Sequence, residues 1–530
     1  GALNAATGVA NCFYDSVPVL FLCGQVSTKV LRTPFSMLRQ RGFQECPTAV
    51  VFESIAKMSV EVTSVYLVKE VLDDAIRTAL QGRPGPVVLS LPLDVLGAQM
   101  PETWPESLSS HLDGPKDGVA PVNRETLARC LAALVEAERP VILAGGGCRN
   151  SAAELREFAE RFQIPVVRTW NALDIVPDDW PLYAGNVGTY GGKGRNFAVQ
   201  QADVVLAIGT RISGRITGGN TKSFLRGAKS VWHVDVDRGV LDGMDVDLVQ
   251  RKKINACAGR FFGACREMSV ERRDYKWQEN GWLGRVRTWR TAYDPVMSLG
   301  QITSACPTNP YAFVRELSGL APANAIIVSE CGGQAVIVHQ VFETKTGQRV
   351  FSSHGGSAMG QGLPMGIGAA IASPIRPVYR IVGDGGLTLS IAELNTLRVQ
   401  RERLRNLKVI VINNRCYGIT RAWQFAQLDG RYFACGPDAA SGYEAPDFLA
   451  VAKAFGVSAA QVESPSVVVA SGDGPHVFDV RCDGWQTYEP AIRGWQTPVE
   501  EMTPALPEAE FLAAMQDVPP LTGWKARRTP

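Results

Sequence analysis

The sequence of 530 residues has no long apolar run, no closely spaced cysteine pair and no excess of one charge. Its longest apolar stretches, such as residues 17–23, have the length of a strand and fall well short of the roughly 18 residues of a membrane-spanning helix. The twelve cysteines contain no Cys-x-x-Cys pair, which favours buried thiols in a reducing compartment over a zinc site or disulfide framework. A net charge of +2 gives no reason to expect nucleic acid as a partner. The sequence therefore predicts a cytoplasmic protein with neither a membrane nor a nucleic-acid partner.

What is present is the composition of an ordinary globular protein, with 45% apolar and 20% charged residues. Strands alternate with helices, which predicts an α/β fold of doubly wound parallel sheets. At about 150 residues per domain, the length suggests three domains. We expect a first domain over residues 1–105, a central domain over 122–260, a third domain over 310–499 and a C-terminal tail over 500–530.

Two strands and a helix in the third domain matter most for function. We expect a strand over 378–382, a helix over 389–400 and a second strand over 407–412. Further strands are expected over 18–23, 86–91, 140–144, 165–168, 204–208, 230–236 and 325–329, and further helices over 68–80 and 124–137. A stretch rich in Pro, Ser, Gly and Asp over about 101–122 is expected to be a linker.

A glycine-rich turn follows the first of these strands, and a pair of asparagines ends the next. The turn reads Gly383-Asp384-Gly385-Gly386, and the second strand ends at Asn413-Asn414. A strand-helix-strand crossover would bring Asp384 and Asn414 to the same edge of a parallel sheet. Carboxylate and amide oxygens suit magnesium, and glycines let the backbone approach a diphosphate at the N-terminus of a helix. Alone, the turn is also what any doubly wound fold supplies, so the prediction depends on the pair of motifs together.

With these motifs, the chain resembles the thiamine diphosphate-dependent carboligases and decarboxylases, most nearly their acetolactate (acetohydroxyacid) synthase branch. The resemblance extends from Gly1 to about Met515 and includes Gly8-Val9-Ala10-Asn11, Phe43-Gln44-Glu45 and the turn over 82–86. It implies pyrimidine-binding, central and diphosphate-binding domains in that order, with the first one incomplete. The family's ring-protonating glutamate would fall upstream of Gly1, so no catalytic residue is assigned and we expect the gene product to begin earlier.

The resemblance also assigns a cofactor site. It implies that Asp384, Asn414 and the carbonyl of Cys416 bind Mg²⁺, and that Met359 is the apolar residue over which thiamine diphosphate bends. Without the resemblance, Met359 would be taken for core packing. The residues implied to bind the cofactor are Asn4, Gly332, Gln334, Met359, Gly383, Gly385, Gly386 and Ile419. Glu330 stands where synthases usually have aspartate, and Gln334 would donate to phosphate from a neutral amide.

Three residues match the substrate-facing positions of synthases, namely Phe43, Gln44 and Trp423. Each has a plain alternative, because Phe43 and Gln44 could belong to a capped surface loop and a tryptophan is often a core anchor. Glu45 is equally compatible with a surface position.

Turns in the central domain resemble the flavin-binding turns of acetolactate synthases. They contain Gly146, Gly147, Arg211 and Arg215. The family's aspartates between the two arginines are replaced by Ser213 and Gly214, and a histidine by Val187. Glycine-rich turns are common in this fold, so FAD is left as an option and not as an expectation.

The function implied is decarboxylation of a 2-oxo acid such as pyruvate and transfer of the two-carbon unit to a second carbonyl compound. The family architecture implies a homodimer or homotetramer. None of the five histidines precedes His111, which favours carboligation over protonation by a histidine pair. The alternatives are another thiamine diphosphate enzyme, such as a decarboxylase, an oxidase or an aldehyde transferase of a sugar or secondary-metabolite pathway, and a non-catalytic homologue.

Overall fold

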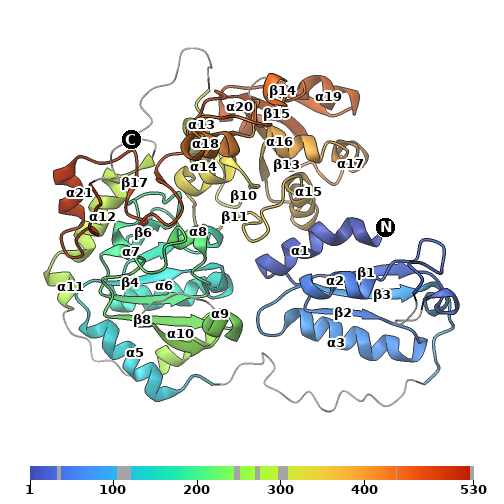
Figure 1. Ribbon diagram of the computed structural model, residues 1–530, viewed down its shortest axis with the longest axis horizontal. Coiled ribbons are helices and arrows are strands. Elements are labelled where there is room, and N and C mark those ends of the chain that lie inside the picture. Colours follow the sequence, from blue (N-terminus) through green and yellow to red (C-terminus); the bar gives the residue numbers. More distant parts are fainter. Residues whose placement is uncertain are drawn as a thin grey trace. The chain divides into compact units, whose positions relative to one another are not determined.

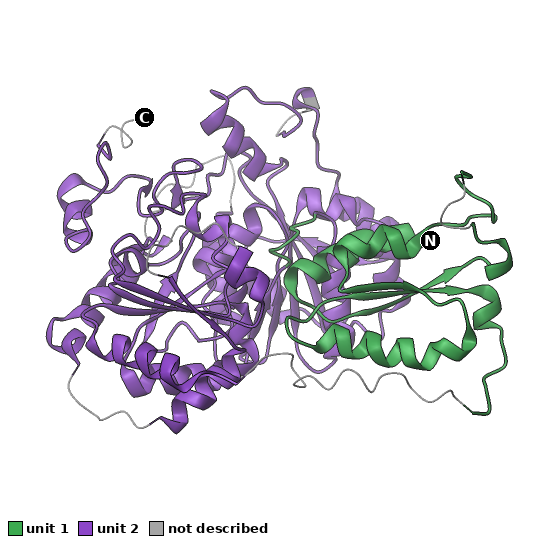
Figure 2. Cartoon of the chain, turned by 60° about the horizontal axis from the view of Figure 1, so that its bottom comes forward, with its two compact units in different colours: residues 1–120, 353–358 green, residues 121–352, 359–530 purple. Residues whose placement is uncertain are grey.

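The computed structural model describes residues 1–32, 37–103, 121–243, 251–268, 275–295, 308–436 and 439–525. The chain divides into two compact units (Figure 2). One contains Gly1–Ala120 and Ser353–Ala358, and the other contains Pro121–Ser352 and Met359–Pro530. Most of the expected linker lies outside the described residues. Among the described helices, none is both long enough and apolar enough to cross a membrane.

The first unit is built on a three-stranded parallel sheet of order β1-β3-β2 (Figure 1). Its strands are β1 (Leu20–Gln25), β2 (Met58–Glu61) and β3 (Val87–Pro92), and its helices are α1 (Ala6–Asp15), α2 (Thr48–Phe52), α3 (Val68–Leu80) and α4 (Leu93–Leu96). The helix α3 is amphipathic, and its buried Ala75 and Ala79 pack against Val87 and Leu89 of β3.

The short segment Ser353–Ala358 belongs to this unit because it packs on α1. The Ser353 hydroxyl donates to the side-chain oxygen of Asn11 at 3.2 Å. The backbone N–H of Gly355 donates to Asp15 at 2.9 Å. A Cβ at Gly355 would come within 2.5 Å of Tyr14, so this position requires a residue without a side chain.

The second unit contains two six-stranded sheets, and the first of them is the central sheet of order β6-β5-β4-β7-β8-β9. All neighbours are parallel, and the inner strands β4, β5, β7 and β8 are buried along their whole length, as sheets covered on both faces require. The strands are β4 (Pro140–Ala144), β5 (Val166–Arg168), β6 (Tyr183–Asn186), β7 (Val204–Ile208), β8 (Ser230–Asp235) and β9 (Arg251–Asn255). The helices around them are α5 (Arg124–Glu136), α6 (Ala152–Phe162), α7 (Phe197–Gln200), α8 (Gly214–Thr217), α9 (Arg238–Gly243), α10 (Ala258–Glu267), α11 (Lys276–Glu279) and α12 (Trp282–Ala292).

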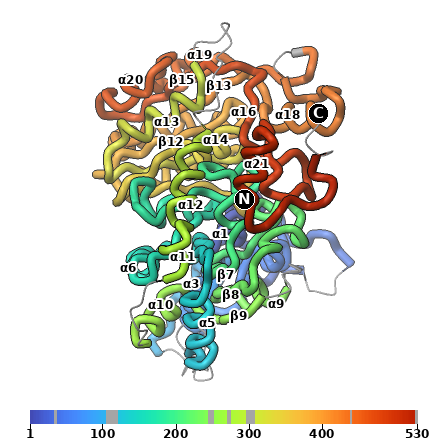
Figure 3. The backbone as a smooth tube through the Cα atoms, turned by 90° about the vertical axis from the view of Figure 1, so that its left-hand side faces the viewer, coloured from blue at the N-terminus to red at the C-terminus, as the bar shows by residue number. Residues whose placement is uncertain are grey.

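The core of the central sheet extends beyond residue 260 and takes in part of the C-terminal segment. Trp277, Trp282 and Trp289 are buried in it, and so are Phe511 and Met515 of the tail. Before the tail (red in Figure 3) comes β16 (Ala491–Ile492), which pairs antiparallel with β17 (Met502–Thr503) of the tail, and α21 (Glu508–Ala514) follows. Its segment over 500–525 is therefore part of a packed core.

The third sheet has the order β11-β10-β12-β13-β15-β14 and is also parallel throughout. Its strands are β10 (Ile326–Val328), β11 (Arg349–Phe351), β12 (Val378–Gly383), β13 (Leu407–Asn413), β14 (Ser458–Gln461) and β15 (His476–Arg481). Its helices are α13 (Pro310–Leu320), α14 (Gly333–Val341), α15 (Gly362–Ala372), α16 (Asp384–Leu389), α17 (Glu393–Val399), α18 (Gly418–Gln427), α19 (Phe448–Ala454) and α20 (Pro465–Ala470).

The α/β class with parallel sheets is confirmed, and each strand expected from the sequence is present within two residues at either end. The expected helix over 389–400 is present only in part, as α17 over Glu393–Val399. The helix α16 starts at Asp384 itself, and a break over Ser390–Ala392 separates the two helices. The glycines of the turn are thus the first turn of a helix, because buried packing overrides their low helix propensity.

Candidate functional site

Three helices of the second unit begin at the carboxyl edge of the third sheet. The helix α14 follows β10, α16 follows β12 and α18 follows β13, and these three strands are neighbours (Figure 1). The first residues of the helices are Gly333, Asp384 and Gly418. Helix N-termini present unpaired backbone N–H groups and a partial positive charge. This edge is therefore suited to an anion such as a diphosphate.

Three oxygen-bearing groups lie together beside these helix ends. One terminal atom of the Asn414 amide is 3.2 Å from Asp384 Oδ2 and 2.9 Å from the Cys416 carbonyl oxygen. Asp384 and Asn414 are brought together because β12 and β13 pair in parallel, so that both strands end at the same edge. Asp384, Asn414 and the Cys416 carbonyl, which the resemblance implies as metal ligands, therefore lie close enough together to face one ion.

The orientation of the Asn414 amide determines what this cluster can hold. With its nitrogen turned inward, the amide donates to both Asp384 and Cys416. With its oxygen turned inward, three oxygen atoms face one another without a proton between them, and Cys416 N–H donates to Asn414 Oδ1 at 3.4 Å. A hard divalent cation resolves that repulsion, and carboxylate, amide and carbonyl oxygens are ligands that Mg²⁺ accepts. The residues present thus fit a magnesium ion.

The Asp384 carboxylate is almost fully buried. Burial raises its pKa to about 6, against the lowering effect of hydrogen bonds from the Gly385 N–H and the Tyr443 hydroxyl. The distances from Oδ1 are 2.6 Å to Gly385 N and 3.2 Å to Tyr443 Oη. The carboxylate is therefore costly to ionise without a counter-charge, which is what a bound cation supplies. In the described ranges, no group of three or more His, Cys, Asp and Glu side chains forms another candidate metal site.

A fully buried ion pair lies beneath the glycine turn. Arg380 Nη2 is 3.1 Å from Glu330 Oε2, and the Glu330 carboxylate also accepts from the Gly362 N–H at 3.2 Å. A Cβ at Gly386 would lie 2.2 Å from Glu330 Oε2. Gly386 is thus required by this packing, whatever the turn binds.

Met359 and Gln334 also contact the turn. The Met359 methyl lies 3.1 Å from the point where a Cβ at Gly385 would stand, so the methionine faces the backbone of α16. Gln334 Oε1 lies 3.2 Å from the corresponding point at Gly383. Gly332 has φ of 106°, a conformation that favours glycine. Gln334 donates to the Cys331 carbonyl, so in this structure its amide is turned onto its own loop.

The helix α18 carries two more predicted residues, Ile419 and Trp423. Ile419 is half-buried and packs against the core of the third sheet. Trp423 is 58% exposed, which excludes the alternative of a core anchor. The buried Gln424 bonds the backbone of Phe433 in both directions and ties the following loop to the helix.

Asn4, Phe43 and Gln44 belong to the first unit. Asn4 is exposed in the short 3-10 helix Ala2–Ala5. Phe43 is 86% exposed, and Gln44 beside it has φ of 63°. The Glu45 carboxylate accepts from the backbone N–H groups of Arg32, Arg41 and Gly42 at 2.8 to 2.9 Å. Glu45 thus shapes the loop that exposes Phe43, and the substrate-facing roles of Phe43 and Gln44 stay predictions.

Neighbouring residues of the protein occupy the space beside the glycines in the turns of the central sheet. A Cβ at Gly147 would lie 2.7 Å from the backbone of Gly209, and one at Gly146 would meet Asn171 at 3.0 Å. Trp495 covers α8, since a Cβ at Gly214 would lie 2.7 Å from its ring. Arg215 lies 4.6 Å over the Trp170 ring, and Arg211 is exposed. Packing accounts for these glycines, so FAD remains an option that the structure does not test.

Sequence reasoning missed several residues of the site. Tyr443, Tyr488 and Arg380, the partner of Glu330, carry no motif. Tyr443 lies in an irregular segment after α18, and Tyr488 in another after β15. Their only signal is chemical: an arginine in an otherwise apolar buried strand requires a buried acceptor. That argument points to Arg380 but not to the tyrosines.

Two family models match the chain. Residues 127–253 match the thiamine pyrophosphate enzyme central domain, and residues 330–474 match the C-terminal thiamine pyrophosphate-binding domain. The second match contains the helix ends and the oxygen cluster described above.

Curated relatives cover most of the chain. A probable acetolactate synthase large subunit of Methanocaldococcus jannaschii is 32% identical over 88% of this chain and 76% of its own length. Acetolactate synthase 1 of Zea mays is 31% identical over 89% of this chain and 71% of its length. The isozyme 2 large subunit of Escherichia coli is 29% identical over 90% and 81%. On these matches, the chain belongs to the thiamine pyrophosphate enzymes, within the group that contains the acetolactate synthase large subunits.

Proposed function

We propose that this protein is a thiamine diphosphate- and Mg²⁺-dependent carboligase of the acetolactate synthase type. It decarboxylates a 2-oxo acid such as pyruvate and transfers the two-carbon unit to a second carbonyl compound. The observation that carries the proposal is the convergence of the Asp384, Asn414 and Cys416 oxygens beside helix N-termini, in a chain whose relatives are named acetolactate synthases.

In this proposal, Asp384, Asn414 and the Cys416 carbonyl hold the metal. The N-termini of α14 and α18 attract the diphosphate through their free N–H groups, and Gly383 and Gly385 allow it to approach the backbone. Gly332 and Gln334 lie where α14 begins and would contact the diphosphate there. Met359 and Ile419 provide apolar surface for the cofactor. When bound, thiamine diphosphate supplies the carbon nucleophile and the electron sink that decarboxylation requires.

The acceptor side is assigned to Phe43, Gln44 and Trp423, with Asn4 facing the cofactor ring. Phe43 and Trp423 are both highly exposed and are thus accessible to a ligand, which supports the assignment. Residues 1–105, 122–260 and 310–499 are then the pyrimidine-binding, central and diphosphate-binding domains, assembled as a homodimer or homotetramer in the cytoplasm.

Product analysis tests the reaction type. With pyruvate labelled at C2, thiamine diphosphate and Mg²⁺, NMR should show the label in an acetolactate-type ligation product, or in a mixed product when a second carbonyl compound is offered. The label should appear in free acetaldehyde only as a minor product, because an enclosed site that holds an electrophile favours ligation over protonation. Acetaldehyde or acetate as the dominant product with every acceptor would move the assignment to a decarboxylase or an oxidase.

A further inference from the structure

Tyr488 contacts the cluster of Asp384, Asn414 and Cys416 oxygens, although it comes from a segment beyond both family-model matches. The segment over 483–490 follows β15, the strand that pairs with β13. Tyr488 is 7% exposed, and its hydroxyl lies 3.3 Å from the Asn414 amide. The C-terminal match ends at residue 474. The segment thus delivers a polar group to a site that the matched domain would otherwise form alone.

Two glycines leave the space that Tyr488 occupies. A Cβ at Gly333, the first residue of α14, would lie 2.2 Å from the Tyr488 ring. A Cβ at Gly418, the first residue of α18, would lie 2.3 Å from the Tyr488 hydroxyl and 2.5 Å from Asn414 Nδ2. The phenol therefore stands between two of the three helix N-termini, directly beside the amide of the proposed metal ligand Asn414.

The backbone of the segment is fixed on both sides of Tyr488. Before it, Arg421 donates to the Gln486 carbonyl at 3.0 Å and the Cys416 thiol contacts the Gly484 carbonyl at 3.2 Å. After it, Gln340 of α14 donates to the Pro490 carbonyl at 2.8 Å. The hydroxyl thus has a set position, and its contact with Asn414 is not a chance encounter of a loose loop.

The orientation of the Asn414 amide decides whether the Tyr488 hydroxyl accepts or donates the hydrogen bond between them. If Asn414 turns its oxygen to a metal, its nitrogen points to Tyr488 and needs an acceptor, which the phenol oxygen provides. If Asn414 turns its nitrogen inward, its oxygen can accept from the Tyr488 hydroxyl instead. In the metal-binding orientation, Tyr488 is the only hydrogen-bond partner of Asn414 Nδ2 among the described residues. Without the hydroxyl, that buried donor would be unsatisfied.

We propose that Tyr488 is a positioning residue of the metal site: it accepts the hydrogen bond from Asn414 Nδ2 and so holds the amide oxygen toward the cation. Because a phenol oxygen both donates and accepts, Tyr488 allows the amide to turn over when the metal binds. A phenylalanine would penalise the metal-binding orientation more than the other one, since an unsatisfied buried N–H is rarer and costlier than an unsatisfied carbonyl. The proposal depends on the proposed magnesium site.

The test compares Tyr488→Phe with the wild type and with Tyr379→Phe. Tyr379 is a buried tyrosine at the start of β12, at the other end of the strand from the site, and serves as the matched control. Binding of thiamine diphosphate is followed by tryptophan fluorescence while MgCl₂ is titrated, and again in EDTA. Tyr488→Phe should raise the half-saturating Mg²⁺ concentration about tenfold and leave metal-free binding unchanged, whereas Tyr379→Phe should change neither by more than about twofold.

Tyr488→Phe with wild-type Mg²⁺ dependence, or with an equal loss of binding in EDTA, would overturn the positioning role. If Tyr488→Phe does not fold, Gly418→Ala decides the question in the same assay, because its methyl displaces the hydroxyl and the amide while the tyrosine stays. Wild-type Mg²⁺ dependence of that variant would equally contradict the proposal. Asp384→Ala, titrated in parallel, separates a failure of the Tyr488 proposal from a failure of the magnesium site. If Asp384→Ala also retains the wild-type Mg²⁺ dependence, the magnesium site itself is wrong.

Discussion

At the scale of single residues, Asp384 is a buried carboxylate with a raised pKa. The carboxylate is 2% exposed, and burial raises its pKa to about 6 from an ordinary value of 3.8. The side chain closest to it in the cluster, Asn414, carries no charge. A cation is the group that compensates the ionised form, so protons and Mg²⁺ should compete for this carboxylate.

This competition predicts how cofactor binding depends on pH. Above about pH 6, Asp384 is ionised and the half-saturating Mg²⁺ concentration should be constant. Below about pH 6, the proton must be displaced, so the required Mg²⁺ concentration should rise about tenfold per pH unit. Titrations of thiamine diphosphate binding between about pH 5 and about pH 8 would measure this. A requirement that stays flat to about pH 5 would show that Asp384 does not bind the metal.

The same shift affects the stability of the metal-free protein. The folded-state pKa lies above the unfolded value, so the folded state binds the proton more tightly between about pH 3.8 and about pH 6. The free energy of unfolding contributed by this group should therefore fall as pH rises through that window and stay low above it. Asp384→Asn should remove this dependence and stabilise the metal-free protein above about pH 6 by up to roughly 3 kcal/mol.

Trp423 gives a second prediction at this scale. Its exposed position on α18 fits the proposed assignment to the acceptor and not to the oxygen cluster. Trp423→Leu should therefore change the ratio of products formed from two competing acceptors, by about fivefold or more, while the rate of carbon dioxide release changes less. An unchanged product ratio, measured in a mixture of two acceptors, would remove Trp423 from the acceptor site.

At the scale of elements, β12 runs directly into α16. The strand ends at Gly383 and the helix begins at the next residue, so the turn has no loop. Gly386 in the first helical turn lies against the buried carboxylate of Glu330, which is paired with Arg380 from the strand itself. The position of the turn is therefore set by an ion pair beneath it.

A methyl group at Gly386 tests this dependence. Gly386→Ala should lower the free energy of unfolding by about 2 kcal/mol or more, because its Cβ would overlap Glu330 in a closed core. Gly368→Ala in the middle of α15 is the matched control, since nothing lies within 4 Å of its Cβ and the position is exposed. That change should stabilise the protein by up to about 1 kcal/mol. Chemical denaturation measures both, and equal effects would refute the packing argument.

The elements also show how far the sequence could predict the site. Apolar runs of strand length gave the positions of β12 and β13, and parallel pairing then implied that Asp384 and Asn414 meet. The start of α16 was not predictable, because three of its first four residues would suggest a turn if local propensity decided. Tyr488 was not predictable either, because an irregular segment has no periodicity from which to place a side chain.

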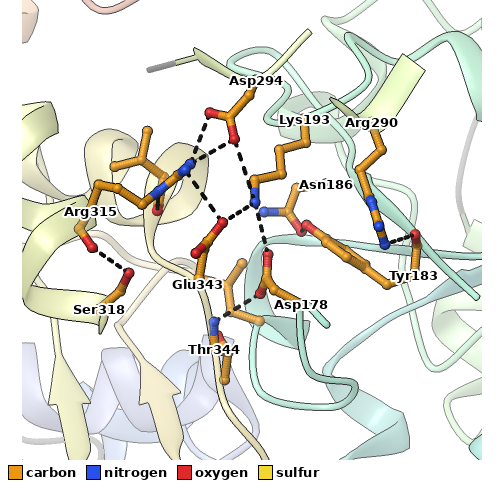
Figure 4. Close-up of polar contacts among 12 residues, drawn as sticks. Asp178, Tyr183, Asn186, Lys193, Arg290, Asp294, Arg315, Ser318, Glu343 and Thr344 are labelled. Carbon is orange, nitrogen blue, oxygen red and sulfur yellow. Dashed lines mark hydrogen bonds and ion pairs between the residues drawn. The ribbon is translucent and has the colours of Figure 1, made fainter. Parts of the chain in front are cut away.

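At the scale of the whole molecule, a polar cluster joins the central and third sheets within the second unit (Figure 4). Lys193 from the central part lies 2.6 Å from Glu343 and 3.6 Å from Asp294, and it is 3.7 Å from Asp178. The Asp178 carboxylate accepts from the Thr344 N–H at 2.9 Å. Only 11% of the Lys193 side chain is exposed, so its charge is screened little by solvent.

Lys193→Met should therefore destabilise the protein as a whole. The change keeps the aliphatic stem but removes the cation that three carboxylates share, while Arg168 on Asp178 and Arg315 on Asp294 and Glu343 remain. It should lower the free energy of unfolding by about 2 kcal/mol. Lys525→Met is the control, because Lys525 pairs with Glu508 at 2.7 Å with both side chains more than half exposed, and should cost less than about 1 kcal/mol. Equal losses for the two variants in urea denaturation would mean that the cluster contributes no more than a surface pair.

The most direct test of the whole account is a calorimetric titration of thiamine diphosphate into the protein, with and without Mg²⁺, for the wild type and Asp384→Ala. The wild type should bind the cofactor tightly only with Mg²⁺. Asp384→Ala removes a charged ligand from the oxygen cluster, so Mg²⁺-dependent binding should fall by at least about a hundredfold while the circular dichroism spectrum stays that of the folded protein. Undiminished Mg²⁺-dependent affinity in a folded Asp384→Ala protein would contradict the assignment of this cluster as the metal site.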